Sequence, residues 1–173
     1  VKVLPVIFMR HPIDRIASAY EFEKKQGGDS FGAVLARNTD FSGYVETRLA
    51  LPHDRQCRNF HLHRFAAMFG ERQGDEFVRA KMAIEKLPFV GVVEAFAQSL
   101  VRLETWLKAE GFKDLKIKLV EKNVNRDKKI SLDERLENIK TELGGAGYSI
   151  FMDTNKEDIE IYKFCKGGAL KYE

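Results

Sequence analysis

The sequence Phe8-Met9-Arg10-His11-Pro12-Ile13-Asp14-Arg15-Ile16-Ala17-Ser18-Ala19-Tyr20 marks a change from strand to helix. The apolar run at residues 3–9 is typical of a buried strand. Pro12 is favoured in the first turn of a helix, because its fixed φ suits the helix and its missing N–H is not needed there. Asp14 places negative charge near the positive end of the helix dipole. Arg10 therefore falls at the carboxyl end of a strand, where open α/β sheets bind ligands and a guanidinium can hold a phosphate.

The rest of the chain alternates apolar runs with amphipathic segments. Strands are expected at 89–93, from a fully apolar run, and at 115–120, from an alternating Leu-Lys-Ile-Lys-Leu pattern. Apolar spacings of three and four, with capping residues such as Asp75 and Ser131, predict helices. The expected helices cover 12–25, 31–37, 41–49, 75–87, 95–110, 132–143 and 155–165, with a break at the glycines of 144–147. Because strands alternate with helices, we expect an α/β fold with a central parallel sheet flanked by helices.

The composition is ordinary for a globular protein. The chain has 173 residues, 44% hydrophobic and 32% charged, which is enough for a single domain spanning 1–173. No segment approaches ~20 consecutive apolar residues, so no membrane span is expected. The net charge of +3 is too small to indicate a nucleic-acid partner, but it is compatible with an anionic nucleotide or glycan.

Cysteine usage favours a reducing compartment. Cys57 and Cys165 are the only cysteines in the sequence, and they lack metal-ligand spacing, which favours two free thiols over a disulfide. The interpretation is a cytoplasmic protein of bacterial type, and the alternative is a protein of the Golgi lumen with one disulfide bridge. No metal site is expected, because the histidines and cysteines do not stand at the usual ligand spacing.

Three motifs occur in the order found in one enzyme family. Residues 10–20 have the pattern R-x-P-x-x-R-x-x-S-A-Y, residues 89–100 read F-V-G-V-V-E-A-F-A-Q-S-L, and residues 155–162 carry N-x-x-D-x-x-I-Y. The sequence resembles the sulfotransferases that use 3′-phosphoadenosine 5′-phosphosulfate (PAPS), especially the carbohydrate group that includes heparan 2-O-sulfotransferases. Many members have aspartate where this chain has His11. The resemblance covers nearly the whole chain and implies a P-loop-like sulfotransferase fold, with a central parallel sheet flanked by helices.

The resemblance also implies which residues hold the donor. In the family, the arginine and serine that match Arg10 and Ser18 bind the 3′-phosphate of the nucleotide, and Arg15 is a further candidate nearby. The segment 122–129 matches a loop that closes over the nucleotide, which makes Asn125 and Lys128 candidate cofactor-binding residues. The alternative for Arg10 is an ordinary strand-to-helix junction with a solvated arginine. The alternative for the segment is a plain polar turn before a capped helix.

The groups that perform the chemistry are not visible in the sequence. Sulfuryl transfer needs a loop of backbone N–H groups with a lysine for the 5′-phosphosulfate, and a general base for the acceptor hydroxyl. No glycine pair is followed by the Gly-Lys-Ser/Thr spacing of a phosphate loop. Family members carry that loop and the catalytic residue upstream of the segment that matches Arg10. We therefore expect the catalytic residue upstream of Val1, and a domain that is incomplete at its N-terminus.

A basic segment supplies candidates for acceptor binding: Arg58, His61, His63 and Arg64. Guanidinium groups suit the sulfate and carboxylate groups of an anionic glycan. The spacing of His61 and His63 would place both imidazoles on one side of a strand. The alternative is a solvated basic surface with ordinary histidines.

The expected function is therefore that of an enzyme. It would transfer a sulfuryl group from PAPS to a hydroxyl, and a carbohydrate is the expected acceptor. No metal is expected to take part. Two alternatives stay open. One is a non-catalytic sulfotransferase-like module that binds a nucleotide or a glycan, and the other is a P-loop kinase-like phosphotransferase.

Overall fold

The computed structural model describes residues 2–70, 74–119 and 130–170. These residues form eight α-helices, one short 3-10 helix and a sheet of two strands. In chain order the elements are β1 (Ile7–Met9), α1 (Pro12–Lys25), α2 (Phe31–Asn38), α3 (Phe41–Ala50), α4 (Phe60–Ala66), α5 (Glu76–Lys86), β2 (Val90–Val92), η1 (Val93–Ala95), α6 (Phe96–Ala109), α7 (Leu132–Thr154) and α8 (Lys156–Leu170).

The sheet corrects the expected fold class. β1 and β2 pair in parallel, with Ile7 opposite Val90 and Met9 opposite Val92. Within the described ranges no third strand joins them. The expectation of an α/β, P-loop-like sulfotransferase fold with a central parallel sheet flanked by helices is therefore wrong, because the described chain is mostly helical.

The strand predicted at 115–120 is one source of this error. Residues 115–119 form no strand, and Val120 lies outside the described residues. The backbone N–H of Ile117 donates instead to the carboxylate of Glu104 in α6, at 2.7 Å. An alternating pattern yields a strand only where a neighbouring backbone completes the ladder, and here a side chain takes that place.

Local signals located most of the helices. α1 begins at Pro12 and ends at Lys25, as predicted. Asp75 and Ser131 each accept a hydrogen bond from the backbone N–H three residues later, at 3.0 and 3.1 Å, and so cap α5 and α7. Gly144 has a φ of 69° and interrupts the helical geometry at the predicted break, but α7 continues beyond it to Thr154.

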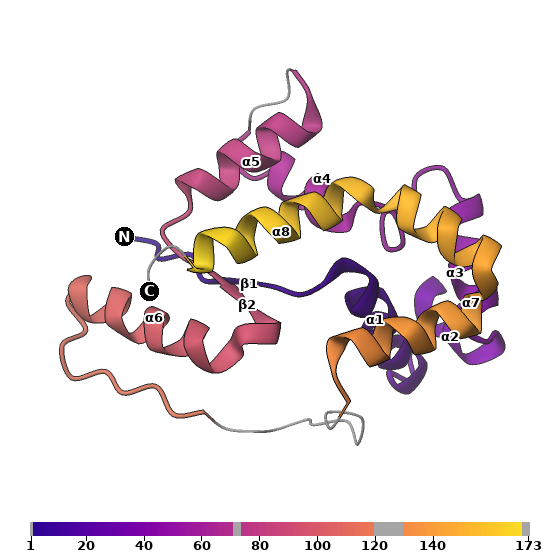
Figure 1. Ribbon diagram of the computed structural model, residues 1–173, viewed down its shortest axis with the longest axis horizontal. Helices are drawn as coiled ribbons and strands as arrows, with labels where there is room; N and C mark the ends of the chain where they lie inside the picture. The colour runs from indigo at the N-terminus through magenta and orange to yellow at the C-terminus, as the bar shows by residue number, and fades with distance from the viewer. Residues whose placement is uncertain (1, 71–73, 120–129, 171–173) are drawn as a thin grey trace.

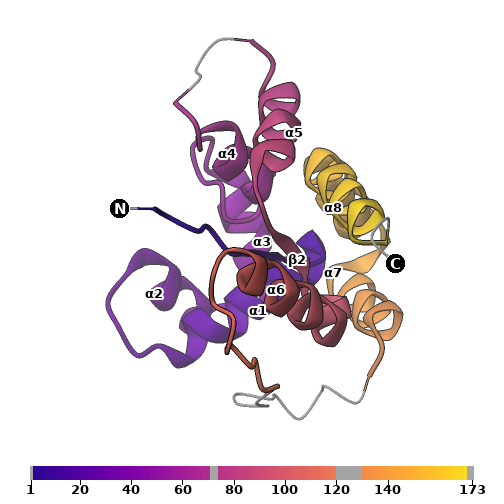
Figure 2. The same ribbon diagram turned by 90° about the vertical axis from the view of Figure 1, so that its left-hand side faces the viewer.

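The strands belong to a first hydrophobic core. Figure 1 shows β1 and β2 between α6 on one side and α5 and α8 on the other. Figure 2, turned by 90°, likewise shows α4 and α5 on the side of β2 opposite to α6. This core contains buried side chains from β1, α4, α5, β2 and α8. One from each element, in that order, is Met9, Leu62, Ile84, Val92 and Ile161. Burying such a side chain fully contributes roughly 1.5–3 kcal/mol, so this core holds the ends of both strands against α8.

A second core holds α1, α3 and α7 together, and Figure 1 shows these helices with α2 at one end of the molecule. Its buried side chains include Ile13, Ile16, Tyr44, Val45 and Phe151. The apolar face predicted for the first helix is thus buried against helices rather than against a large sheet.

Buried polar groups at the junction of α7 and α8 connect the two cores. Asn155 donates from Nδ2 to the carbonyls of Cys57 and Phe151, both at 2.9 Å, and accepts from the N–H of Asn59 at 3.1 Å. Asp158, in the first turn of α8, accepts from two N–H groups of α4. The N-x-x-D part of the third motif therefore joins three segments of the fold.

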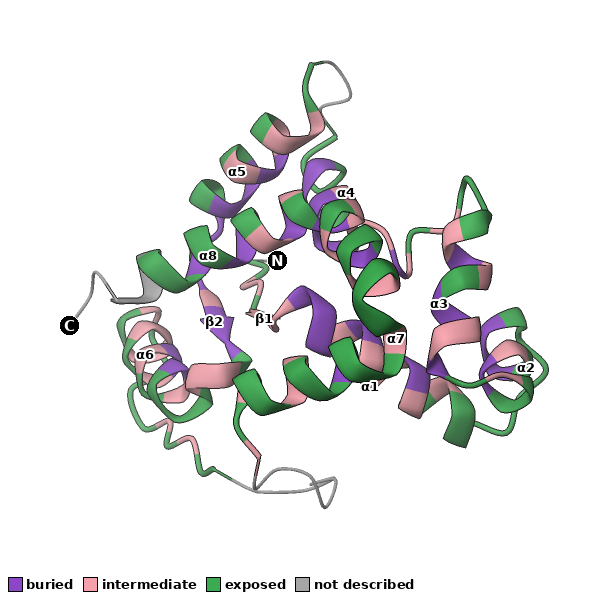
Figure 3. Cartoon of the chain, turned by 45° about the vertical axis from the view of Figure 1, so that its right-hand side comes forward, coloured by how far each residue is buried: buried purple, intermediate pink, exposed green. Residues whose placement is uncertain are grey.

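Burial follows this arrangement. Figure 3 shows buried residues on β2 and α1, and many exposed residues on the outer turns of α6 and α7. Cys57 and Cys165 are both free and buried, one in each core. None of the helices in the described ranges has the length and apolarity that a membrane crossing requires.

Candidate functional site

Arg10 follows directly after β1, as predicted, and its side chain is anchored. The side chain is 31% exposed, and its Nε donates to Oδ2 of Asp14 at 2.6 Å. Neither Nη atom of Arg10 has a hydrogen-bond partner among the described residues. A guanidinium fixed through Nε, with both amino groups unengaged, is suited to a bidentate contact with a phosphate.

Asp14 is the centre of a cluster of three charges. Asp14 is 2% exposed, and Arg135 of α7 donates to it from Nε at 2.8 Å and from Nη2 at 3.2 Å. Burial by itself would raise the pKa of Asp14, but the hydrogen bonds from Arg10 and Arg135 bring it below its ordinary value. Asp14 is therefore ionised at neutral pH. Two guanidinium groups share one carboxylate, which leaves the cluster positively charged.

Ser18 lies on the same side of α1 as Asp14. Residues four apart are neighbours on the surface of a helix, and a rise of ~1.5 Å per residue separates them by roughly 6 Å along its axis. Ser18 is partly buried. The predicted arginine therefore precedes the N-terminus of α1, where the helix dipole is positive, and the predicted serine lies in the second turn of the helix.

The carboxyl end of β2 meets the same place. The Oε1 atom of Glu94 accepts from the backbone N–H of His11 at 2.8 Å, and its Oε2 accepts from the hydroxyl of Tyr162 at 3.1 Å. The rings of His11 and Tyr162 meet edge to face, with centroids 5.2 Å apart. Glu94 therefore ties the ends of both strands to α8.

Two lysines of α8 add positive charge near His11. Burial lowers the pKa of His11, with Lys163 and Lys166 acting in the same direction and Glu94 and Asp14 opposing it. The ring of His11 is therefore neutral at pH 7. Its buried Nδ1 has no hydrogen-bond partner in the described part of the chain.

The sequence interpretation did not assign Glu94, Tyr162 or Arg135 to the site. Glu94 could have been found, because it follows a buried strand as Arg10 does, and the carboxyl ends of parallel strands meet at one edge. No sequence signal links Arg135 to Asp14, since 121 positions separate them.

Arg15, the further candidate for the nucleotide, makes its contacts elsewhere. Its Nη2 donates to the carbonyl of Gln56, and its guanidinium lies over the Phe60 ring, 4.2 Å from the centroid. Burial lowers the pKa of Arg15. These contacts fasten the loop before α4 to α1, and none of them involves Arg10 or Asp14.

The structure does not bring the two histidine candidates together. His61 and His63 lie in α4, so the expectation that both imidazoles share one side of a strand is wrong, because two positions along a helix differ by about 200°. His61 is buried, with Nδ1 3.3 Å from Oδ2 of Asp158. The His63 side chain is 44% exposed, with Nδ1 3.4 Å from Oε1 of Glu76.

The two arginine candidates for acceptor binding also have separate contacts. Arg58 donates from Nη2 to the carbonyl of Leu49 at 2.6 Å. Arg64 is exposed, and its guanidinium lies 5.2 Å from the centroid of the Phe60 ring. These contacts do not define a common groove for a glycan.

Asn125 and Lys128 lie outside the described residues. The described chain resumes at Ile130, whose carbonyl accepts from Nη1 of Arg135 at 3.0 Å. Because Arg135 also binds Asp14, the chain resumes close to the cluster around Arg10.

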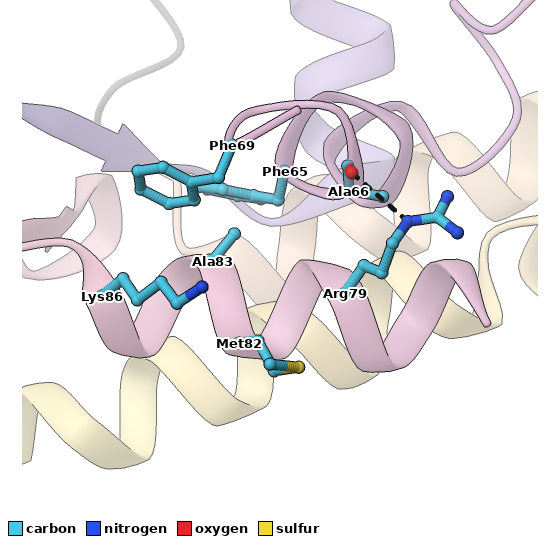
Figure 4. A pocket seen from close by; sticks show the side chains of 7 residues that line it. All are labelled: Phe65, Ala66, Phe69, Arg79, Met82, Ala83 and Lys86. Atoms are coloured by element: carbon cyan, nitrogen blue, oxygen red, sulfur yellow. Dashed lines mark hydrogen bonds between the residues drawn. The ribbon is translucent and has the colours of Figure 1, made fainter. Parts of the chain in front are cut away.

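A small pocket occurs elsewhere, between α4 and α5 (Figure 4), where Nε of Arg79 donates to the carbonyl of Ala66 at 3.4 Å. The residues that line it are Phe65, Ala66, Phe69, Arg79, Met82, Ala83 and Lys86. None of the site residues predicted from the sequence is among them. The described residues contain no group of three or more His, Cys, Asp and Glu side chains that could hold a metal ion.

No protein-family model matches the chain, and no solved structure matches it. An uncharacterized protein of Archaeoglobus fulgidus is 43% identical to it over 167 residues, which cover 94% of the chain. The chain spans 65% of the length of that relative. This similarity assigns no activity to the chain.

Proposed function

We propose that the chain binds the 3′-phosphate of PAPS at the carboxyl ends of β1 and β2, as the donor-binding part of a sulfotransferase that acts on a carbohydrate hydroxyl. The observation that carries this proposal is the state of Arg10, which is anchored through Nε while both amino groups are unengaged by described residues. Ser18 supplies a hydroxyl one turn beyond Asp14 on the same side of α1. The carbohydrate acceptor rests on the motif resemblance.

The charge around the site supports an anionic ligand. Two carboxylates, Asp14 and Glu94, are outnumbered by four cations, which are Arg10, Arg135, Lys163 and Lys166. A phosphate that enters such a region gains from charge-assisted hydrogen bonds and from the surrounding field. The 3′-phosphate is the group that distinguishes PAPS from common adenine nucleotides, so the site would select for it.

The second candidate is a module that binds the nucleotide without turnover. The contacts of Glu94 favour this candidate. Both carboxylate oxygens of Glu94 already accept hydrogen bonds, from His11 and from Tyr162, so Glu94 is not placed as a free general base. The proposal assigns no catalytic base to the chain. Two free, buried thiols support a reducing, cytoplasmic compartment as part of the same proposal.

Calorimetric titration with adenosine 3′,5′-bisphosphate and with AMP tests the binding proposal. Arg10→Ala should weaken binding of the bisphosphate by roughly ten- to a hundredfold, because charge-assisted hydrogen bonds to the phosphate are lost. It should change AMP binding far less. Arg37→Ala removes an exposed arginine of α2 and serves as the matched control. Equal losses for the two nucleotides, or no preference of the unmodified protein for the bisphosphate, would overturn the proposal.

Transfer of radiolabelled sulfate from PAPS to a panel of glycan acceptors, by a protein that includes any segment encoded upstream of Val1, separates the two candidates. Label on a glycan supports the sulfotransferase. Tight binding of the bisphosphate without any transfer supports the non-catalytic module.

A further inference from the structure

The contacts around Asp14 give Arg135 a task different from that of Arg10. Every nitrogen of the Arg135 guanidinium has a partner, since Nε and Nη2 donate to Asp14 and Nη1 donates to the carbonyl of Ile130. In Arg10 only Nε has a partner among the described residues. Of the two arginines, Arg10 is therefore the one whose amino groups no described residue engages.

The two arginines meet on one oxygen of the carboxylate. Oδ2 of Asp14 accepts from Nε of Arg10 at 2.6 Å and from Nη2 of Arg135 at 3.2 Å. Oδ1 of Asp14 accepts from Nε of Arg135 at 2.8 Å. Because Arg135 occupies Oδ1, Arg10 reaches the carboxylate through a single bond. An arginine with access to both oxygens forms the two-bond geometry that guanidinium and carboxylate prefer, and that geometry uses an Nη atom.

We propose that Arg135 is a positioning residue for phosphate binding by Arg10. By occupying Asp14, Arg135 keeps the amino groups of Arg10 open to the ligand. This inference rests on the proposed function. Loss of Arg135 leaves Asp14 buried with Arg10 as its remaining guanidinium partner. The cost of a poorly paired buried charge then draws Arg10 into a two-bond pair with the carboxylate. The carboxylate of Asp14 would then occupy an amino group of Arg10 in place of the ligand, although Arg10 itself is unchanged.

Two substitutions at position 135 separate geometry from charge. Arg135→Lys keeps the positive charge but cannot bridge both oxygens of Asp14, and Arg135→Gln removes the charge. Each should weaken binding of adenosine 3′,5′-bisphosphate about tenfold in calorimetry, the equivalent of one charge-assisted hydrogen bond, while AMP binding stays unchanged. Adding Asp14→Asn to either variant should restore the affinity for the bisphosphate, because a neutral amide no longer draws Arg10 inward.

Lys140→Gln is the matched control, because it removes an exposed cation from the same helix, and it should leave both affinities unchanged. Circular dichroism establishes that each variant is folded before titration. An Arg135→Lys variant that binds the bisphosphate as the unmodified protein does, or a double variant that stays weak, would refute the positioning role. Failure of the proposed function is a different outcome, seen when the unmodified protein shows no preference for the bisphosphate or when Arg10→Ala causes no loss.

Discussion

Asp14 and Arg135, 121 positions apart in the sequence, form a two-bond ion pair between the first turns of α1 and α7, at 2.8 and 3.2 Å. The pair is largely withdrawn from water, since the Asp14 side chain is 3% exposed and that of Arg135 is 26% exposed. Such a pair stabilises the fold only while both partners are charged, because burying one charge without the other is costly. The stability of the protein should therefore depend on the ionisation of Asp14.

Asp14→Asn should lower the free energy of unfolding by about 2 kcal/mol at neutral pH, where it removes the charge from two arginine contacts. Burial opposes ionisation, yet the hydrogen bonds from Arg10 and Arg135 keep the folded-state pKa of Asp14 below 3.8. The stabilisation is therefore complete above that value and is lost as the pH falls through the folded-state pKa. Urea unfolding followed by circular dichroism, from neutral pH to about pH 3, measures both effects.

The free energies of unfolding of Asp14→Asn and of the unmodified chain should therefore converge as the pH falls. Asp153→Asn is the control. The Asp153 side chain is 78% exposed and forms a surface ion pair with Lys156 at 3.5 Å, and such exposed pairs contribute little to stability. A difference between Asp14→Asn and the unmodified chain that stays constant down to the lowest pH would contradict the ion-pair argument.

Features that depend on neighbouring residues were predictable from the sequence. Pro12 and Ser131 act within one helical turn, so the starts of α1 and α7 were predicted correctly. The number of strands depends on partners far along the chain, and the apolar runs around β1 and β2 do not reveal how many others join them. The sheet was therefore overestimated.

The same distinction applies to the site. Arg10 was predicted because the strand, the arginine and the proline are adjacent in the sequence. Arg135 and Tyr162 reach the site only through tertiary packing, which no local pattern encodes. The histidines of α4 were misread as strand residues because this helix receives its cap from another helix, through Asp158.

Gly91 of β2 stands opposite Phe8 of β1 in the sheet register. A Cβ at position 91 would come within 2.6 Å of the Phe8 ring, which is itself held by Phe89 and Phe96. Gly91→Ala should therefore lower the free energy of unfolding by about 1–3 kcal/mol, as overpacking does, measured by urea titration.

Gly145→Ala is the matched control for Gly91→Ala. A Cβ at position 145 in α7 meets nothing within 4 Å, so an alanine side chain there causes no overpacking. The control variant should therefore be at least as stable as the unmodified chain. Equal effects of the two substitutions would show that the contact with Phe8 is not the cause.

Asp158 of α8 caps α4 from outside, because Asn59 at the start of α4 has a left-handed φ of 41° and makes no side-chain cap. The buried carboxylate of Asp158 accepts from the N–H groups of His61 and Leu62, at 2.9 and 2.7 Å. Asp158→Ala leaves both donors buried without an acceptor and should cost about 2–3 kcal/mol in urea unfolding. Asp158→Asn keeps one acceptor oxygen and should recover part of that loss. The exposed Asp153→Ala should change little, and an Asp158→Ala variant as stable as Asp153→Ala would show that α4 forms without this cap.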